Sequence, residues 1–345
     1  MFGRMMNNYY YGKSGKGDFK KDDLPHNRRE LFRDTFRTRL SGLCRINLLY
    51  VLIFLPAIFV MFHFGSSCVE TIYARAQIEQ NDYAAYVDLY KEAGQEVSFD
   101  EEQYNQLKAS EFDYSGYTRS VLLNMLLWLV PCIAITGPFT AGLSYVTRNW
   151  ARDEHAFIWT DFKDAVKANW KQALVLSAIT SILPLTAYVG WEFYGQMAQN
   201  NRIMMIPQVL IVLIALVWAL SITYMHPLAV TYELKMKDVI RNGLLMGIAR
   251  LPMSVAIRLL HCVPAVIGGL MIYFWSPWYG SLILFAWYFL IGFALSRFIT
   301  ASYTNAVFDR FINPRIEGAK VNQGLHMSED DEDGEVENGE GETDN

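Results

Sequence analysis

The sequence lacks the side-chain arrangements on which most catalytic and metal sites depend. Its 345 residues include only 4 cysteines and 6 histidines, and none of them occurs at a metal-ligand spacing. It has no phosphate-binding loop preceded by a strand, no H-E-x-x-H helix and no G-x-S-x-G turn. We therefore expect a protein that is not an enzyme and that holds neither a metal nor a cofactor.

The apolar residues gather in six long segments. Each approaches the roughly 20 apolar residues that an α-helix needs to cross a bilayer. We therefore predict an all-α integral membrane protein with six transmembrane helices, at about 46–64, 120–147, 173–194, 203–226, 253–274 and 281–300. Acidic side chains are absent from the middle of all six. This disfavours coupling to protons or sodium ions, without excluding it, because such transport usually uses a carboxylate at membrane depth.

The basic residues alternate with these segments. Of the 30 lysines and arginines, 24 lie in the segments 1–45, 148–172, 227–250 and 297–345. The positive-inside rule therefore places both termini in the cytoplasm. The first apolar run follows 45 mostly polar residues and is long enough to remain a membrane helix, so we expect no cleaved signal peptide. Because the bases flank apolar spans, their expected partner is the lipid bilayer rather than a nucleic acid.

Three segments are expected to lie outside the membrane: two tails that flank the six-span domain 28–310, and one insertion within that domain. Residues 1–27 are predicted to form a flexible cytoplasmic tail, and residues 311–345 a disordered acidic one, because like charges repel and little apolar surface can be buried. The acidic segment 66–118 is predicted to form an extracellular insertion with two helices joined near Gly94, the second opening at an S-x-x-E pattern from Ser98 to Glu101. It could be a helical cap on the spans or a docking surface. Cys68 is the only cysteine on that side, which excludes a disulfide framework there.

A five-residue pattern of base, Asp, any residue, apolar residue and base occurs three times on the predicted cytoplasmic side, at 33–37, 163–167 and 237–241. In the second copy the apolar and basic side chains fall on different faces of a helix, as in helices that lie in a membrane interface. We therefore predict three transmembrane hairpins, each preceded by a cytoplasmic amphipathic helix. Convergence of short basic helices is the alternative to true internal repetition.

Polar groups at membrane depth are the candidate functional residues, and we select four of them. Arg258 and His261 share a helix face in the fifth span and could form a small basic pocket for a polar or anionic substrate. Alternatively, Arg258 extends to the cytoplasmic interface and His261 bonds a backbone carbonyl. Asn47 and Asn124 are expected to make hydrogen bonds between helices.

The run from Gly137 to Phe162, GPFTAGLSYVTRNWARDEHAFIWTDF, resembles the signature of the YesL-like family of bacterial membrane proteins, as do Asn47-Leu48-Leu49-Tyr50 and Leu55-Pro56. The resemblance extends over about 30–310. Family members often have only a short turn where this chain has Ser66 to Thr118. The resemblance implies a bacterial cell-membrane protein without an established activity, often associated with carbohydrate uptake. It assigns no binding or catalytic residues.

Two functional hypotheses follow from these features. The first is an accessory or regulatory component of carbohydrate uptake, with subunits of an ABC-type transporter or a membrane signalling protein as partners. The second is a transporter or channel for a small polar or anionic solute, with Arg258 and His261 as its binding residues. Neither the substrate nor the oligomeric state follows from the sequence.

Overall fold

The computed structural model describes residues 25–94, 96–97 and 99–325. Within them, helices are the only regular secondary structure. The long helices are α2 (Arg28–Gln80), α5 (Tyr114–Ala151), α6 (Ile158–Asn200), α7 (Met205–Thr231), α9 (Leu251–Phe274) and α11 (Phe293–Phe311). The shorter ones are α3 (Tyr83–Glu92), α4 (Glu101–Ala109), α8 (Met236–Ala249) and α10 (Pro277–Trp287). Most of the residues predicted to form the two tails, 1–24 and 326–345, lie outside the described part.

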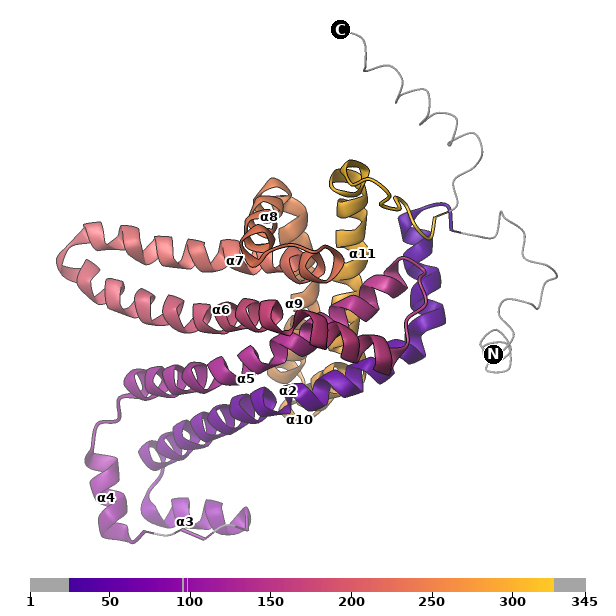
Figure 1. Ribbon diagram of the computed structural model, residues 1–345. Coiled ribbons are helices and arrows are strands. Elements are labelled where there is room, and N and C mark those ends of the chain that lie inside the picture. Colours follow the sequence, from indigo (N-terminus) through magenta and orange to yellow (C-terminus); the bar gives the residue numbers. More distant parts are fainter. Residues whose placement is uncertain (1–24, 95, 98, 326–345) are drawn as a thin grey trace, which may run out of the picture. The chain divides into compact units, whose positions relative to one another are not determined.

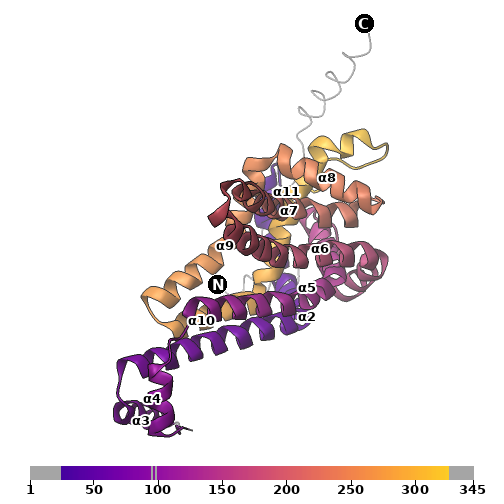
Figure 2. The ribbon, with the colours of Figure 1, turned by 90° about the vertical axis from the view of Figure 1, so that its left-hand side faces the viewer.

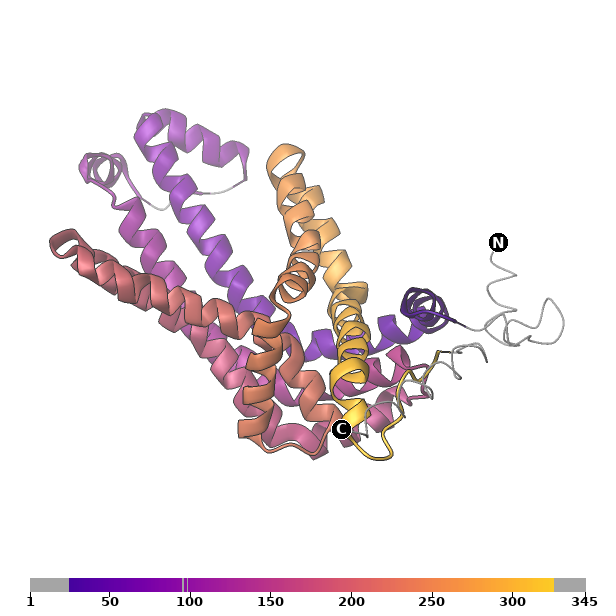
Figure 3. The same cartoon turned by 90° about the horizontal axis from the view of Figure 1, so that it is seen from above.

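Six helical segments in the described residues are long and apolar enough to cross a membrane, which confirms the predicted fold class. Between 11 and 22% of the most apolar window of each segment is buried, so most of its side chains face outward, as those of lipid-facing helices do. The helices α9 and α10 form a hairpin (Figures 2 and 3). Its turn carries a cluster of exposed aromatic side chains, which is typical of a membrane interface. Its most exposed members are Tyr273, Phe274, Trp275 and Trp278.

The amphipathic segments differ from the prediction in two of the three copies. The first and second copies are the opening turns of α2 and α6, which continue without a break into their spans. Only the third is a separate helix, α8. Pro252, in the first turn of α9, has no backbone N–H with which a continuous helix would bond the carbonyl of Ile248, and so it separates α8 from its span. No proline lies at the corresponding places in α2 and α6, where the prolines are Pro56 and Pro184.

The chain divides into two compact units. The larger unit comprises Met1–Ile53, Thr136–Ser177 and Leu216–Asn345, and its described part runs from residue 25 to residue 325. Its core joins α6, α7, α8 and α11, with Leu176, Met225, Leu228 and Val239 fully buried. In the same unit α5 approaches α6 closely, because a Cβ atom at Gly137 would lie 2.3 Å from the carbonyl oxygen of Ala173. Small residues at such positions allow membrane helices to pack backbone against backbone.

The smaller unit, Phe54–Ile135 with Ala178–Ala215, contains the insertion. There α3 and α4 follow the end of α2 (Figure 1), and Gly94, with φ of 71°, stands between them. Ser98 lies outside the described residues, and the residue that caps α4 is Asp100, which forms a capping box with Gln103. Tyr104 is fully buried and donates from its hydroxyl to the carbonyls of Ile78 and Asn81, at 3.0 and 2.9 Å. Burial raises the pKa of Tyr104, so this hydroxyl remains a donor at neutral pH.

A basic cluster as candidate functional site

The two residues predicted from the fifth span lie in the larger unit on one face of α9. They are three positions apart, so Arg258 and His261 are stacked on successive turns. The ring Nε2 of His261 lies 3.4 Å from the hydroxyl of Thr300 on α11, and the ring also bonds the backbone of Ser296. The Nε of Arg258 is buried and has no hydrogen-bond partner among the described residues.

Two further basic residues face the same region. Arg297 lies one turn from Thr300 on α11. Its positive charge disfavours a positive charge on Arg258, on His261 and on His226, so these three side chains lie within range of its charge. His226, on α7, is only 3% exposed, and its ring Nδ1 has no hydrogen-bond partner in the described part of the chain. We call His226, Arg258, His261 and Arg297 the basic cluster.

In the part of the chain that the structure describes, no acidic residue compensates the basic cluster. Within residues 25–94, 96–97 and 99–325, neither arginine forms an ion pair, and no carboxylate interacts electrostatically with any of the four side chains. The Tyr50 hydroxyl interacts electrostatically with Arg297 and hydrogen-bonds Thr140 at 2.8 Å, and the Cys262 thiol interacts electrostatically with Arg258. Two guanidinium groups that repel each other in a partly buried site are unfavourable unless an anion joins them.

Asn47 holds the segment that leads to Arg297. Between α10 and α11 the chain forms a π-helical turn, Tyr288–Gly292, which leaves backbone groups without their usual helical partners. The Asn47 amide donates to the carbonyls of Tyr288 and Phe289 at 2.9 and 2.8 Å, and its oxygen accepts from the N–H of Ala294 at 2.9 Å. Because Asn47 is fully buried on α2, it fixes the start of α11 and therefore the position of Arg297, one turn further on.

Asn124 does not play the corresponding role. Its side chain is exposed, and its amide donates at 2.9 Å to the carbonyl of Ser120 in its own helix. The prediction of a hydrogen bond between helices is therefore wrong for this residue within the described part of the chain. An exposed polar group at a helix surface can bond back to the preceding turn, and a sequence pattern does not distinguish the two outcomes.

We predict that Asn47→Ala lowers the free energy of unfolding by about 2 kcal/mol, because buried carbonyls and one N–H lose their partners. For a domain of this size that corresponds to a fall of about 4 to 8 °C in the unfolding temperature in detergent. Asn124→Ala is the matched control and should leave that temperature unchanged. An equal response to both substitutions would contradict the role given to Asn47.

A second polar network lies where α11 ends. Asp309, 6% exposed, accepts hydrogen bonds from Arg28 and from the amide of Asn313. The oxygen of Asn313 in turn accepts from the Tyr232 hydroxyl at 2.6 Å. Burial, with Asp309 acting in the same direction, raises the pKa of Tyr232 to about 12, which keeps this hydroxyl a donor. The network is fully paired, so it is a structural link rather than a ligand site.

The fold and the basic cluster together define an all-α, multi-pass membrane protein. Residues 120–191 match a family of proteins of unknown function, DUF624. The match covers most of α5 and α6 and includes the run 137–162 on which the resemblance to YesL-like proteins rests. A search of curated proteins and a search of solved structures find no match. One part of the chain, residues 120–191, is thus similar to an uncharacterised family, and the YesL-like assignment stays a prediction.

Sequence reasoning found half of the basic cluster. Arg297 falls inside the predicted span 281–300, but the count of cytoplasmic lysines and arginines assigns it to the flanking segment 297–345. Treating every ionisable residue within a span as a candidate would have found it. His226 is the last residue of the predicted fourth span, where a histidine is typical of an interface. Only the packing of α7 against α9 and α11 reveals that it faces the arginines.

Proposed function

We propose that the chain binds a small anionic ligand at the basic cluster. The observation that supports this function is the presence of two arginines and two histidines without a compensating carboxylate in the described residues. Guanidinium groups recognise carboxylates and phosphates through paired, charge-assisted hydrogen bonds. An anion of this kind would relieve the repulsion between Arg258 and Arg297.

The proposed role of this binding is accessory or regulatory rather than enzymatic. A carrier that works against a gradient needs an energy source, and acidic residues for coupling to protons or sodium are absent from the middle of the spans. We infer that the chain assists a partner that supplies the energy, with carbohydrate uptake of the ABC type as the system implied by the resemblance. Both termini are proposed to face the cytoplasm of a bacterial cell, where the transporter's ATP-hydrolysing subunits would lie.

Ligand binding is tested with the purified full chain in detergent. Phosphate, sulfate and gluconate serve as anionic probes and glucose as the neutral one, and the shift of the unfolding temperature is measured against probe concentration. The anions should stabilise the protein saturably, glucose should not, and Arg258→Ala combined with His261→Ala should remove the effect. Arg202→Ala, which removes an exposed arginine of the smaller unit, is the matched control. Anion stabilisation that survives the double substitution would refute the site.

The accessory role needs a separate experiment. Isolation from native membranes in mild detergent should recover transporter or signalling subunits above the level of a control membrane protein. A second candidate, transport of the anion by the chain itself, is favoured by the position of the basic cluster between three membrane helices. Reconstitution into liposomes separates the two: probe flux that depends on Arg258 and His261, without any recovered partner, would replace the accessory role by transport.

A further inference from the structure

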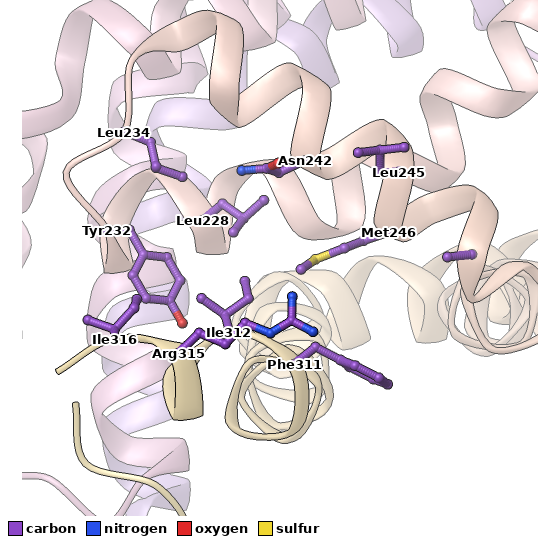
Figure 4. Close-up of a pocket in the computed structure, with 11 residues that line it drawn as sticks. Leu228, Tyr232, Leu234, Asn242, Leu245, Met246, Phe311, Ile312, Arg315 and Ile316 are labelled. Atoms are coloured by element: carbon purple, nitrogen blue, oxygen red, sulfur yellow. The ribbon is translucent and has the colours of Figure 1, made fainter. Parts of the chain in front are cut away.

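The larger unit contains a pocket away from the basic cluster, at the end of the membrane domain that carries α8. Its cavity of about 490 Å³ lies between the end of α7, α8 and the end of α11. Apolar side chains form most of its wall, and the fully buried Leu228 belongs to it (Figure 4). The apolar members of the wall also include Leu234, Leu245, Met246, Ala249, Phe311, Ile312 and Ile316. The size and lining are those of a site for an apolar ligand group.

The pocket has one charged member, Arg315, whose side chain lies among the apolar ones in Figure 4. It is exposed, and it forms no side-chain hydrogen bond or ion pair with any residue in the described part of the chain. Two more guanidinium groups, of Arg250 and Arg310, lie over the ring of Phe311 at 5.2 and 5.6 Å from its centroid. Positive charge therefore lies beside the apolar wall of the cavity, at Arg315 and around Phe311.

The pocket lies beside α8, and the residues of this helix indicate that the pocket is at the membrane surface. α8 connects the ends of two predicted spans, and its exposed Lys237 and Arg241 are typical of a helix at the level of the lipid head groups. The charge distribution assigns this side to the cytoplasmic leaflet, in which anionic lipids give a negative surface potential. An occupant from the surroundings would thus meet apolar walls within the membrane and cationic groups at its surface.

We propose that this pocket binds one anionic phospholipid, with an acyl chain against Leu245 and Met246 and the phosphate on Arg315. The charge favours this occupant over a zwitterionic lipid, because the contact between Arg315 and the phosphate is strongest for a head group that carries no compensating positive charge. The chain's own acidic tail is a poorer match for the pocket, because residues 328–345 contain ten acidic residues and almost no large apolar ones. This inference is independent of the proposed function, since it shares no residue with the basic cluster.

The experiment counts lipids on the purified full chain by native mass spectrometry. Phosphatidylglycerol and phosphatidylcholine with the same acyl chains are added in turn, and glycerol phosphate is added as the soluble head group alone. One saturable phosphatidylglycerol molecule should bind, about fivefold more tightly than phosphatidylcholine for the loss of a single arginine contact. Glycerol phosphate should not bind, because it lacks the apolar chain that the pocket accepts.

Two substitutions separate the parts of the pocket. Arg315→Ala should reduce phosphatidylglycerol to the affinity of phosphatidylcholine, and Ala249→Phe, which fills the cavity, should remove the saturable site for both lipids. Arg241→Ala on α8 removes an exposed arginine that does not line the pocket, and it should leave the preference intact. Arg315 and Arg241 are exposed charged residues, whereas Ala249 lines the cavity. Monodisperse elution in size-exclusion chromatography verifies that each of the three variants is folded. An unchanged preference in Arg315→Ala, or Arg315-dependent binding of glycerol phosphate, would overturn the proposal.

Discussion

Arg297→Ala is expected to abolish anion binding while making the ligand-free protein more stable. In the free protein, Arg297 and Arg258 repel each other, and no carboxylate in the described residues compensates either charge. Removing one guanidinium therefore removes a repulsion and the cost of keeping that charge partly buried. For an anion held between them, the same substitution removes a charge-assisted pair, which costs about 2 to 5 kcal/mol, or a loss of affinity of roughly 30-fold or more.

One titration of unfolding temperature against anion concentration measures both the stability of the ligand-free protein and its affinity for the anion. Arg297→Ala should begin at or above the wild-type temperature and show little stabilisation by phosphate or gluconate. Arg297→Lys should retain part of the response, because an ammonium group keeps the charge but loses the paired geometry of guanidinium. Arg310→Ala is the control, since it removes an exposed arginine from the same helix. A destabilised Arg297→Ala protein with intact anion binding would show that Arg297 is a packing residue and not a ligand.

The regular part of the fold follows from local sequence properties. The predicted span 253–274 nearly coincides with α9, Leu251–Phe274, because a helix in a bilayer must satisfy its own backbone over a fixed length. Helix ends were less predictable where no proline or glycine marks them. Thus the amphipathic opening of α6 continues into its span, and only α8 is separated from the next helix by Pro252.

The candidate site depends on contacts between residues far apart in the chain, and such contacts leave little signal in a single sequence. Asn47 is recognisable as an unusual polar residue in a span, but its partners lie more than 240 residues away in a π-helical turn. The π-helix itself, Tyr288–Gly292, has an ordinary apolar sequence. The spacing of Arg258 and His261 predicts their shared helix face, whereas the lack of a carboxylate around them in the described residues depends on how α7 and α11 pack beside α9.

The second large effect is expected at Asp309, where substitution should release the first turn of α2 from the end of α11. Asp309→Ala removes the acceptor of Arg28 and leaves the buried amide of Asn313 without its partner. Breaking a buried pair costs about 3 to 5 kcal/mol. Arg28 is 28% exposed and can regain water, so we expect about 3 kcal/mol. This corresponds to a fall of about 6 to 12 °C in the unfolding temperature.

Hydrogen exchange locates the effect. Amides of residues 28–33 and 320–324 should lose protection together, because Arg28 also donates to the side chain of Asn322 at 2.8 Å. A double-substitution cycle of Arg28→Ala and Asp309→Ala should give a coupling energy above about 1 kcal/mol, beyond the range of exposed pairs. Glu317→Ala removes an exposed carboxylate nearby and should change neither the stability nor the exchange. A coupling energy near zero would mean that α11 ends where it does through the apolar packing of Val307 and Phe308 alone, and that the buried carboxylate contributes no specific link.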